Sequence, residues 1–129
     1  MPVRIVRLGT PRSSDEGLRI GTVRRPPRGV PKSEFASRDF YDVWYPNLAP
    51  TQQTMDLAHQ AETPRDWAAF FRKYRAEMNT PENSRTLDML AALSKHASFA
   101  VGCYCADESH CHRSALRELL RERGASIAS

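Results

Sequence analysis

The sequence predicts an α/β fold, a three-layer Rossmann-like domain in which helices flank a small, mainly parallel sheet. Two observations lead to this class. Short β-branched runs occupy the first part of the chain, and amphipathic helical patterns occupy the second part. A largely apolar run at 98–105 then separates two helical patterns, as a buried parallel strand does. With 129 residues, the chain is expected to form a single domain, residues 1–129.

The first predicted elements are two short strands followed by a basic loop. Residues 3–8 alternate apolar and basic side chains, which is typical of a strand, and residues 18–23 are predicted to form a second strand. Residues 24–34 contain three prolines and a glycine, so they are predicted to form a loop without regular structure. This loop has the densest positive charge in the chain, from Arg24, Arg25, Arg28 and Lys32.

Residues 35–50 are rich in aromatic side chains without a clear period, which predicts irregular structure or a short helix. Within this segment, Phe40, Trp44 and Leu48 are expected to pack on the core. A helix with a thin apolar face is expected to begin near residue 51. The next helix is marked by Thr63 as the N-cap, Pro64 at its first position and Asp66 as the reciprocal cap. Its apolar stripe, assigned to the core, consists of Trp67, Phe70, Phe71, Tyr74 and Met78.

The last part of the chain alternates helix, strand and helix. The Thr-Pro pair at 80–81 repeats the start signal, and the apolar face of the helix that follows comes from Leu87, Leu90, Ala91 and Leu93. Residues 98–105 are predicted to be the central parallel strand, and 114–123 a helix that stops at Gly124. Because sites in such sheets lie outside the carboxyl ends of strands, the segment 103–114 is predicted to carry the site.

The composition is typical of a soluble intracellular protein with a small excess of positive charge. No apolar run approaches the roughly 20 residues that cross a bilayer, so no membrane partner is predicted. The first ten residues lack the apolar core of a secretory signal, and a cytoplasmic location is expected. The formal net charge of +4 favours anionic partners. All three cysteines lie within 103–111, which favours reduced thiols that perform chemistry over a disulfide framework.

The segment 103–114 gathers thiol, imidazole and guanidinium groups around one helix start. Cys103 and Cys105 face the same side of the predicted strand. Cys111 lies at the helix start, where the helix dipole favours a thiolate. Cys111 or His112 is therefore expected to act as nucleophile or general base. A small anionic or phosphorylated ligand is expected to bind here, held by Arg113, Ser114, His110, Arg24 and Arg28.

Three alternatives stay open. Asp107 or Glu108 would neutralise Arg113 if the loop has only a structural role. A transition metal such as zinc would be held by the thiolate and imidazole groups of Cys103, Cys111 and His112. Nucleic acid would contact the arginine loop together with Tyr41, Trp44 and Tyr45. The sequence names no cofactor, and it defines neither the identity of the ligand nor the oligomeric state.

Several motifs occur in a characteristic order. An apolar strand, an acidic loop and a helix that opens with Cys-His-Arg bring together Cys103, Asp107, Glu108, Cys111, His112 and Arg113. An Arg-x-x-Pro-Arg-Gly loop at 24–29 and a Leu-Ala-Pro at 48–50 precede them. The helix pattern of Trp67, Tyr74 and Glu77 completes the set.

In these motifs the chain resembles the domain of unknown function 488 family, whose best-known branch is YeaO-like. The resemblance spans residues 18–121. YeaO-like members typically have Asp and Trp where this chain has Val23 and Pro26, and related members often have an acidic residue at the position of Cys105. The resemblance implies an α/β fold with a Rossmann-like core, and it transfers no established activity.

Overall fold

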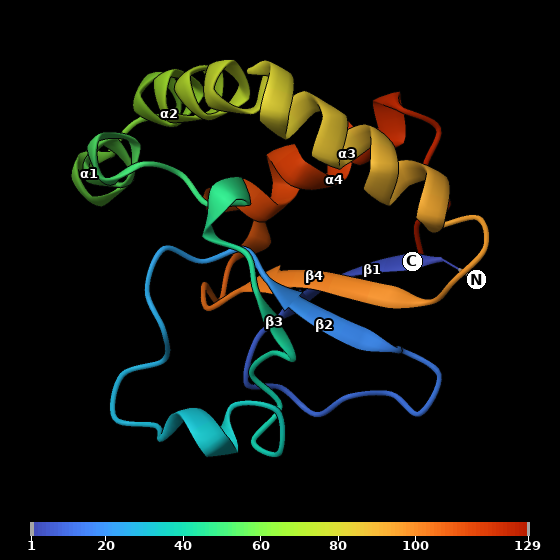
Figure 1. The fold of residues 1–129 in the computed structure, drawn as a ribbon. Helices are drawn as coiled ribbons and strands as arrows, with labels where there is room; N and C mark the ends of the chain where they lie inside the picture. The colour runs from blue at the N-terminus through green and yellow to red at the C-terminus, as the bar shows by residue number, and fades with distance from the viewer. Residues whose placement is uncertain (1, 129) are drawn as a thin grey trace.

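The computed structural model describes residues 2–128 and contains one four-stranded parallel sheet (Figure 1). The strands, in chain order, are β1 Val3–Arg7, β2 Leu18–Gly21, β3 Val43–Trp44 and β4 Phe99–Cys103. Their order across the sheet is β1-β4-β2-β3, and every neighbouring pair is parallel. The predicted α/β fold with a small parallel sheet is therefore confirmed. None of the helices in the described part of the chain is long and apolar enough to cross a membrane.

The strand β4 lies at the centre of the sheet, as predicted for residues 98–105. All five of its residues are buried, and it pairs with β1 on one side and β2 on the other. Its last residue, Cys103, lies opposite Arg7, and Gly102 lies opposite Gly21 at the end of β2. The carboxyl ends of β4 and β2 thus open at the same edge of the sheet, which is where such folds carry their sites.

Three of the four helices form a layer over one face of the sheet, as Figure 1 shows for α2, α3 and α4. The bounds are α1 Gln52–Gln60, α2 Pro64–Met78, α3 Pro81–Leu93 and α4 His112–Glu122. The capping box of Thr63 and Asp66 and the N-cap of Thr80 are both present, and Gly124 has a φ of +80° beyond the end of α4. The apolar core of this layer includes Leu48, Tyr74, Met78, Leu87, Leu116 and Leu120.

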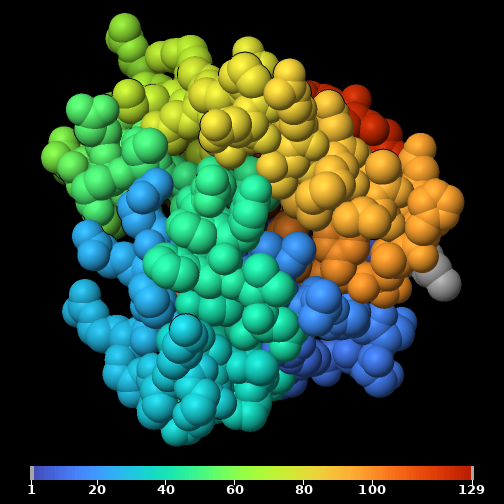
Figure 2. Space-filling model, in the orientation of Figure 1, coloured from blue at the N-terminus to red at the C-terminus, as the bar shows by residue number. Residues whose placement is uncertain are grey.

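The other face of the sheet is covered mainly by loops. Residues 22–42 contain only a short 3-10 helix, η1 Lys32–Glu34, and form a continuous lower layer in the space-filling view (Figure 2). Tyr41 and Val23 pack there with Leu8, Cys103 and Cys111, and Phe35 and Phe40 pack against the same cluster. The third layer of the fold is therefore irregular, because the prolines of this segment prevent a long helix.

Of the two structures predicted for residues 35–50, the irregular one is confirmed and the helix is not. These residues contain the edge strand β3 and a 3-10 helix, η2 Pro46–Leu48, and no α-helix. Leu48 is buried as expected, whereas Trp44 is 44% exposed and the prediction that it packs in the core is wrong. The reason is its place on an edge strand, where its indole N–H reaches back to donate to the carbonyl of Val23 at 2.7 Å.

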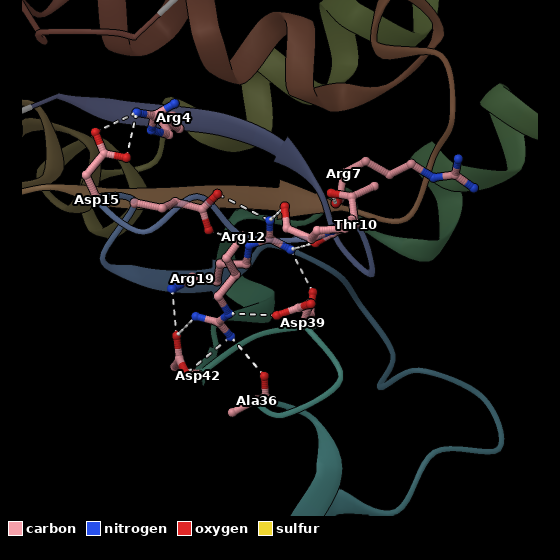
Figure 3. A network of polar contacts seen from close by, with 11 residues as sticks. Arg4, Arg7, Thr10, Arg12, Asp15, Arg19, Ala36, Asp39 and Asp42 are labelled. Atoms are coloured by element: carbon pink, nitrogen blue, oxygen red, sulfur yellow. Dashed lines mark hydrogen bonds and ion pairs between the residues drawn. The ribbon is translucent and has the colours of Figure 1, made fainter.

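Two arginines tie the loops to the first residues of β2 (Figure 3). Arg19 is 1% exposed and donates from Nε to Glu16 at 2.6 Å, while its Nη1 donates to the carbonyls of Thr10 and Asp39. Arg12 donates to Asp42 at 2.7 Å and to Asp39 at 3.2 Å. Because the groups come from separate loops, this network fixes the loop layer against the sheet.

Substituting Asp42 with asparagine is expected to lower the free energy of unfolding by about 1 kcal/mol at neutral pH. Partial burial raises the pKa of Asp42, but hydrogen bonds from Arg12 and from the backbone of Arg19 outweigh it and lower the pKa. A carboxylate with a lowered pKa stabilises the fold fully above its unfolded pKa and ceases to do so as the pH falls through the folded value. Urea unfolding should therefore show a deficit at pH 7 that shrinks at pH 3.

Asp15→Asn is the matched control, because Asp15 is 74% exposed and pairs only with Arg4 at 3.3 Å. An Asp42→Asn deficit of equal size at both pH values would contradict the assigned role of the ionised carboxylate.

Candidate functional site

A cavity of about 410 Å³ opens beside the carboxyl end of β4 and the first turn of α4. One side of the cavity is lined by thiol and imidazole groups, from Cys103, Cys105, Cys111, His112 and His110. The loop after β2 lines another side with Arg24, Arg25 and Arg28. Helices α1 and α2 line the third side with Met55, His59, Trp67 and Phe70. A volume of this size is within the usual range for small-molecule sites.

Three thiols lie together at the end of β4. The Sγ atoms of Cys103 and Cys111 are 2.7 Å apart, and both residues are 2% exposed. Cys105 is the exposed member of the cluster. Hydrogen bonds from Cys103 and Cys111 lower the pKa of Cys105, and the hydrogen bond to Cys105 raises the pKa of Cys103. This thiol cluster therefore favours one negative charge, located on the sulfur that faces solvent.

The thiol of Cys111 behaves differently from that of Cys105. Its hydrogen bond with Cys103 favours the thiolate, but the hydrogen bond to Cys105, burial and the charge of Cys105 together raise the pKa of Cys111 to about 11. The predicted nucleophile Cys111 is thus a buried, protonated thiol that can donate to its neighbour. Cys105 presents the accessible sulfur.

His112 has a defined orientation in the buried part of the site. Its Nε2 lies 2.8 Å from the carbonyl oxygen of Thr22, which can only accept, so Nε2 carries the proton. Burial lowers the pKa of His112 to about 4, which keeps the ring neutral at physiological pH. The unprotonated Nδ1 is left facing the Sγ of Cys111 at 3.6 Å. His112 can therefore accept a proton or bind a metal ion at Nδ1.

An aromatic wall closes the cavity on the side of α2. The rings of Trp67 and His110 are stacked with centroids 4.5 Å apart and an interplanar angle of 5°. Phe70 packs edge-on against Trp67 at 5.7 Å. Asp107 lies 3.4 Å from the imidazole of His110 and holds it in the stack. This wall offers an apolar ring surface opposite the thiols.

Arginine side chains provide the positive charge around the cavity. Arg24 donates from Nε to the carbonyl of Pro50 at 2.9 Å, and its terminal nitrogens have no partner among the described residues. Arg28 has no hydrogen-bond or ion-pair partner among residues 2–128. No described residue that lines the cavity is acidic. An anion would therefore meet guanidinium groups there and no opposing carboxylate.

Arg113 and Ser114 do not line the cavity, although the sequence predicted both as ligand contacts. Arg113 is 4% exposed and donates to the carbonyl of Cys105 at 2.6 Å, and its Nε has no partner within the described residues. Ser114 donates to the carbonyl of Cys111. Glu108 pairs with Arg117, so neither acidic residue of the loop neutralises Arg113. Through the hydrogen bond to the Cys105 carbonyl, the side chain of Arg113 fixes the backbone of Cys105.

Sequence reasoning missed part of the cavity wall. Trp67 was assigned to the core, yet it is half-buried and lines the cavity together with His59, Met55, Tyr104 and Arg25. One feature of the sequence could have indicated that Trp67 lines a cavity. Trp67 lies in the first turn of α2, at the end of the apolar stripe, whereas the buried residues of this helix begin at Phe70. No sequence signal connects α1 with the thiols.

The chain matches a protein-family model. The model described as DUF488-N3a, the active DUF488-N3 subclade, matches residues 3–124. No curated protein and no protein of solved structure gives a match. The matched residues include the whole thiol cluster and the arginine loop.

Proposed function

This chain belongs to the DUF488 family, and we propose that it is a thiol-dependent enzyme that acts on a small anionic ligand in the cavity. The subclade is described as active, which agrees with a site built for chemistry. The observation that carries the proposal is the composition of the cavity. Thiols line one part of it, arginines line another, and no carboxylate lies among its described lining residues.

In this proposal Cys105 is the nucleophile. Its sulfur is the accessible one, and the neighbouring thiols of Cys103 and Cys111 lower its pKa. Cys111 holds the proton nearest the reacting sulfur, and His112 Nδ1, 3.6 Å from the Cys111 sulfur, can accept a hydrogen bond from it. Arg24, Arg25 and Arg28 hold the anionic group, while Trp67 and Phe70 exclude water from the other side.

The test uses a pair of alkylating agents that differ in charge. Iodoacetate is anionic and iodoacetamide is neutral, so their rate ratio, relative to that of free cysteine, reports the local potential at the reacting sulfur. We expect the ratio to favour iodoacetate. Arg28→Gln should reduce it roughly fivefold, because a unit charge about 4 Å from the anionic reagent contributes about 1 kcal/mol even at the dielectric constant of water.

Arg72→Gln is the matched control, since Arg72 is exposed on α2 and does not line the cavity. Inorganic phosphate should slow alkylation of the wild type and have less effect on Arg28→Gln. A wild-type ratio equal to that of free cysteine, and unchanged in Arg28→Gln, would overturn the assignment of an anion site.

Association with nucleic acid remains a prediction with weaker support. Tyr41, one of its expected contacts, is 3% exposed and packs beside Val23 in the loop layer. The indole N–H of Trp44 is used by the carbonyl of Val23. Of the aromatic side chains expected to accompany the arginines, Tyr41 is thus buried in the fold, whereas Trp44 stays 44% exposed.

A further inference from the structure

The buried half of the thiol cluster has the ligand set of a zinc site. Cys103, Cys111 and His112 each offer one ligand atom, all three residues are buried, and these atoms lie within 4.8 Å of one another. The Sγ of Cys111 and the Nδ1 of His112 are 3.6 Å apart. Zinc–sulfur and zinc–nitrogen bonds of about 2.3 and 2.0 Å at a tetrahedral angle separate their ligand atoms by roughly 3.5 Å.

The imidazole of His112 is already oriented for coordination. Its Nε2–H donates to the carbonyl of Thr22 at 2.8 Å, and Thr22 Oγ1, 3.2 Å away, donates in turn to the carbonyl of Gly102. A metal-binding histidine normally has this arrangement, in which a backbone acceptor holds one nitrogen and leaves the lone pair of the other free. The tautomer needed for binding through Nδ1 is therefore present without any rearrangement.

The thiol pair needs one adjustment. Cys103 and Cys111 are 2.7 Å apart, whereas two zinc-bound sulfurs are about 3.8 Å apart in tetrahedral geometry. Small rotations about their Cα–Cβ bonds supply that difference. The nearby arginines oppose a divalent cation, but two bound thiolates cancel its charge and leave their field little changed.

We propose that Cys103, Cys111 and His112 bind a soft divalent cation such as Zn²⁺, with a fourth position open to the cavity. Mg²⁺ and Ca²⁺ are excluded as occupants because the ligand set has no oxygen donor. This metal binding does not depend on the proposed function.

The experiment titrates the reduced, chelator-treated full chain with Co²⁺, whose thiolate charge-transfer and tetrahedral d–d absorption bands report the ligands directly. We expect one equivalent to bind with both sets of bands and Zn²⁺ to displace it. Cys103→Ser and Cys111→Ser should each weaken binding by about 100-fold or more, since even an outer-shell partner contributes 10- to 100-fold. Cys105→Ser should retain the bands and lose less than about tenfold.

The variants separate this proposal from the preceding one. Metal binding without charge-selective alkylation would leave the zinc site standing and remove the anion site. Absence of thiolate-to-cobalt bands in the wild type, or equal losses in Cys105→Ser and Cys103→Ser, would overturn the site. Circular dichroism of each variant checks folding, and either buried cysteine serves if the other variant unfolds.

Discussion

Replacing Arg19 with methionine is expected to lower the free energy of unfolding by about 3–5 kcal/mol, the cost of leaving a buried charge without its partner. Glu16 is 2% exposed, and the guanidinium of Arg19 contacts both of its carboxylate oxygens, at 2.6 and 3.2 Å. The same guanidinium also satisfies the carbonyls of Thr10 and Asp39, at 2.8 and 2.7 Å. Methionine fills similar apolar space and provides none of these donors.

Urea unfolding followed by circular dichroism measures the effect. Arg4→Met is the matched control, because Arg4 is on the neighbouring part of the sheet and pairs only with the exposed Asp15. That control should lose less than about 1 kcal/mol. The double variant Arg19→Met with Glu16→Gln should recover part of the loss, since it removes the unpaired charge. A single variant no less stable than the control would show that Glu16 finds water or another donor.

Local signals predicted most of the regular structure. The capping box of Thr63 and Asp66, the N-cap at Thr80 and the stop at Gly124 each depend on residues a few positions apart, and all three are present. The burial of residues 99–103 likewise follows from a continuous apolar run. These elements were predictable because the interactions that define them lie within one segment of the chain.

The layer beneath the sheet was not predictable in the same way. Strand β3 has two residues and exists because Ile20 and Gly21 pair with Val43 and Trp44 across more than twenty positions of sequence. No local pattern reports such a pairing. The loop around Tyr41 is fixed by Arg12 and Arg19, whose partners also lie in distant segments. Arg12 and Arg19 therefore have a structural role.

The candidate site shows the same division. The sequence located the thiols and imidazoles at the end of β4, and the structure brings Cys103, Cys111 and His112 together. It predicted both His112 and Arg113 as site residues, but successive helical residues point about 100° apart, and the helix register relative to the loop decides which of them faces the cavity. His112 lines the cavity, and Arg113 lies beneath the Cys105 backbone.

Substituting Cys105 with serine is expected to slow alkylation of the protein by iodoacetamide about 100-fold. Only Cys105 is exposed, while Cys103 and Cys111 are each 2% exposed. An alkylating agent needs a thiolate that it can approach in line, and burial together with hydrogen bonding to Cys105 raises the pKa of the other two thiols. Mass spectrometry of the early product should locate the modification at Cys105.

The comparison with Cys111→Ala decides between two nucleophiles. If Cys105 reacts, Cys111→Ala removes the thiol that stabilises its thiolate, and the rate should fall by roughly tenfold, as one charge-assisted bond contributes about 1.5 kcal/mol or more. If Cys111 reacts, as its position at the helix start suggested, the order of the two variants is reversed and the label appears at Cys111. Because the pKa is lowered at Cys105 and raised at Cys111, we expect the larger loss in Cys105→Ser, which identifies Cys105 as the nucleophile.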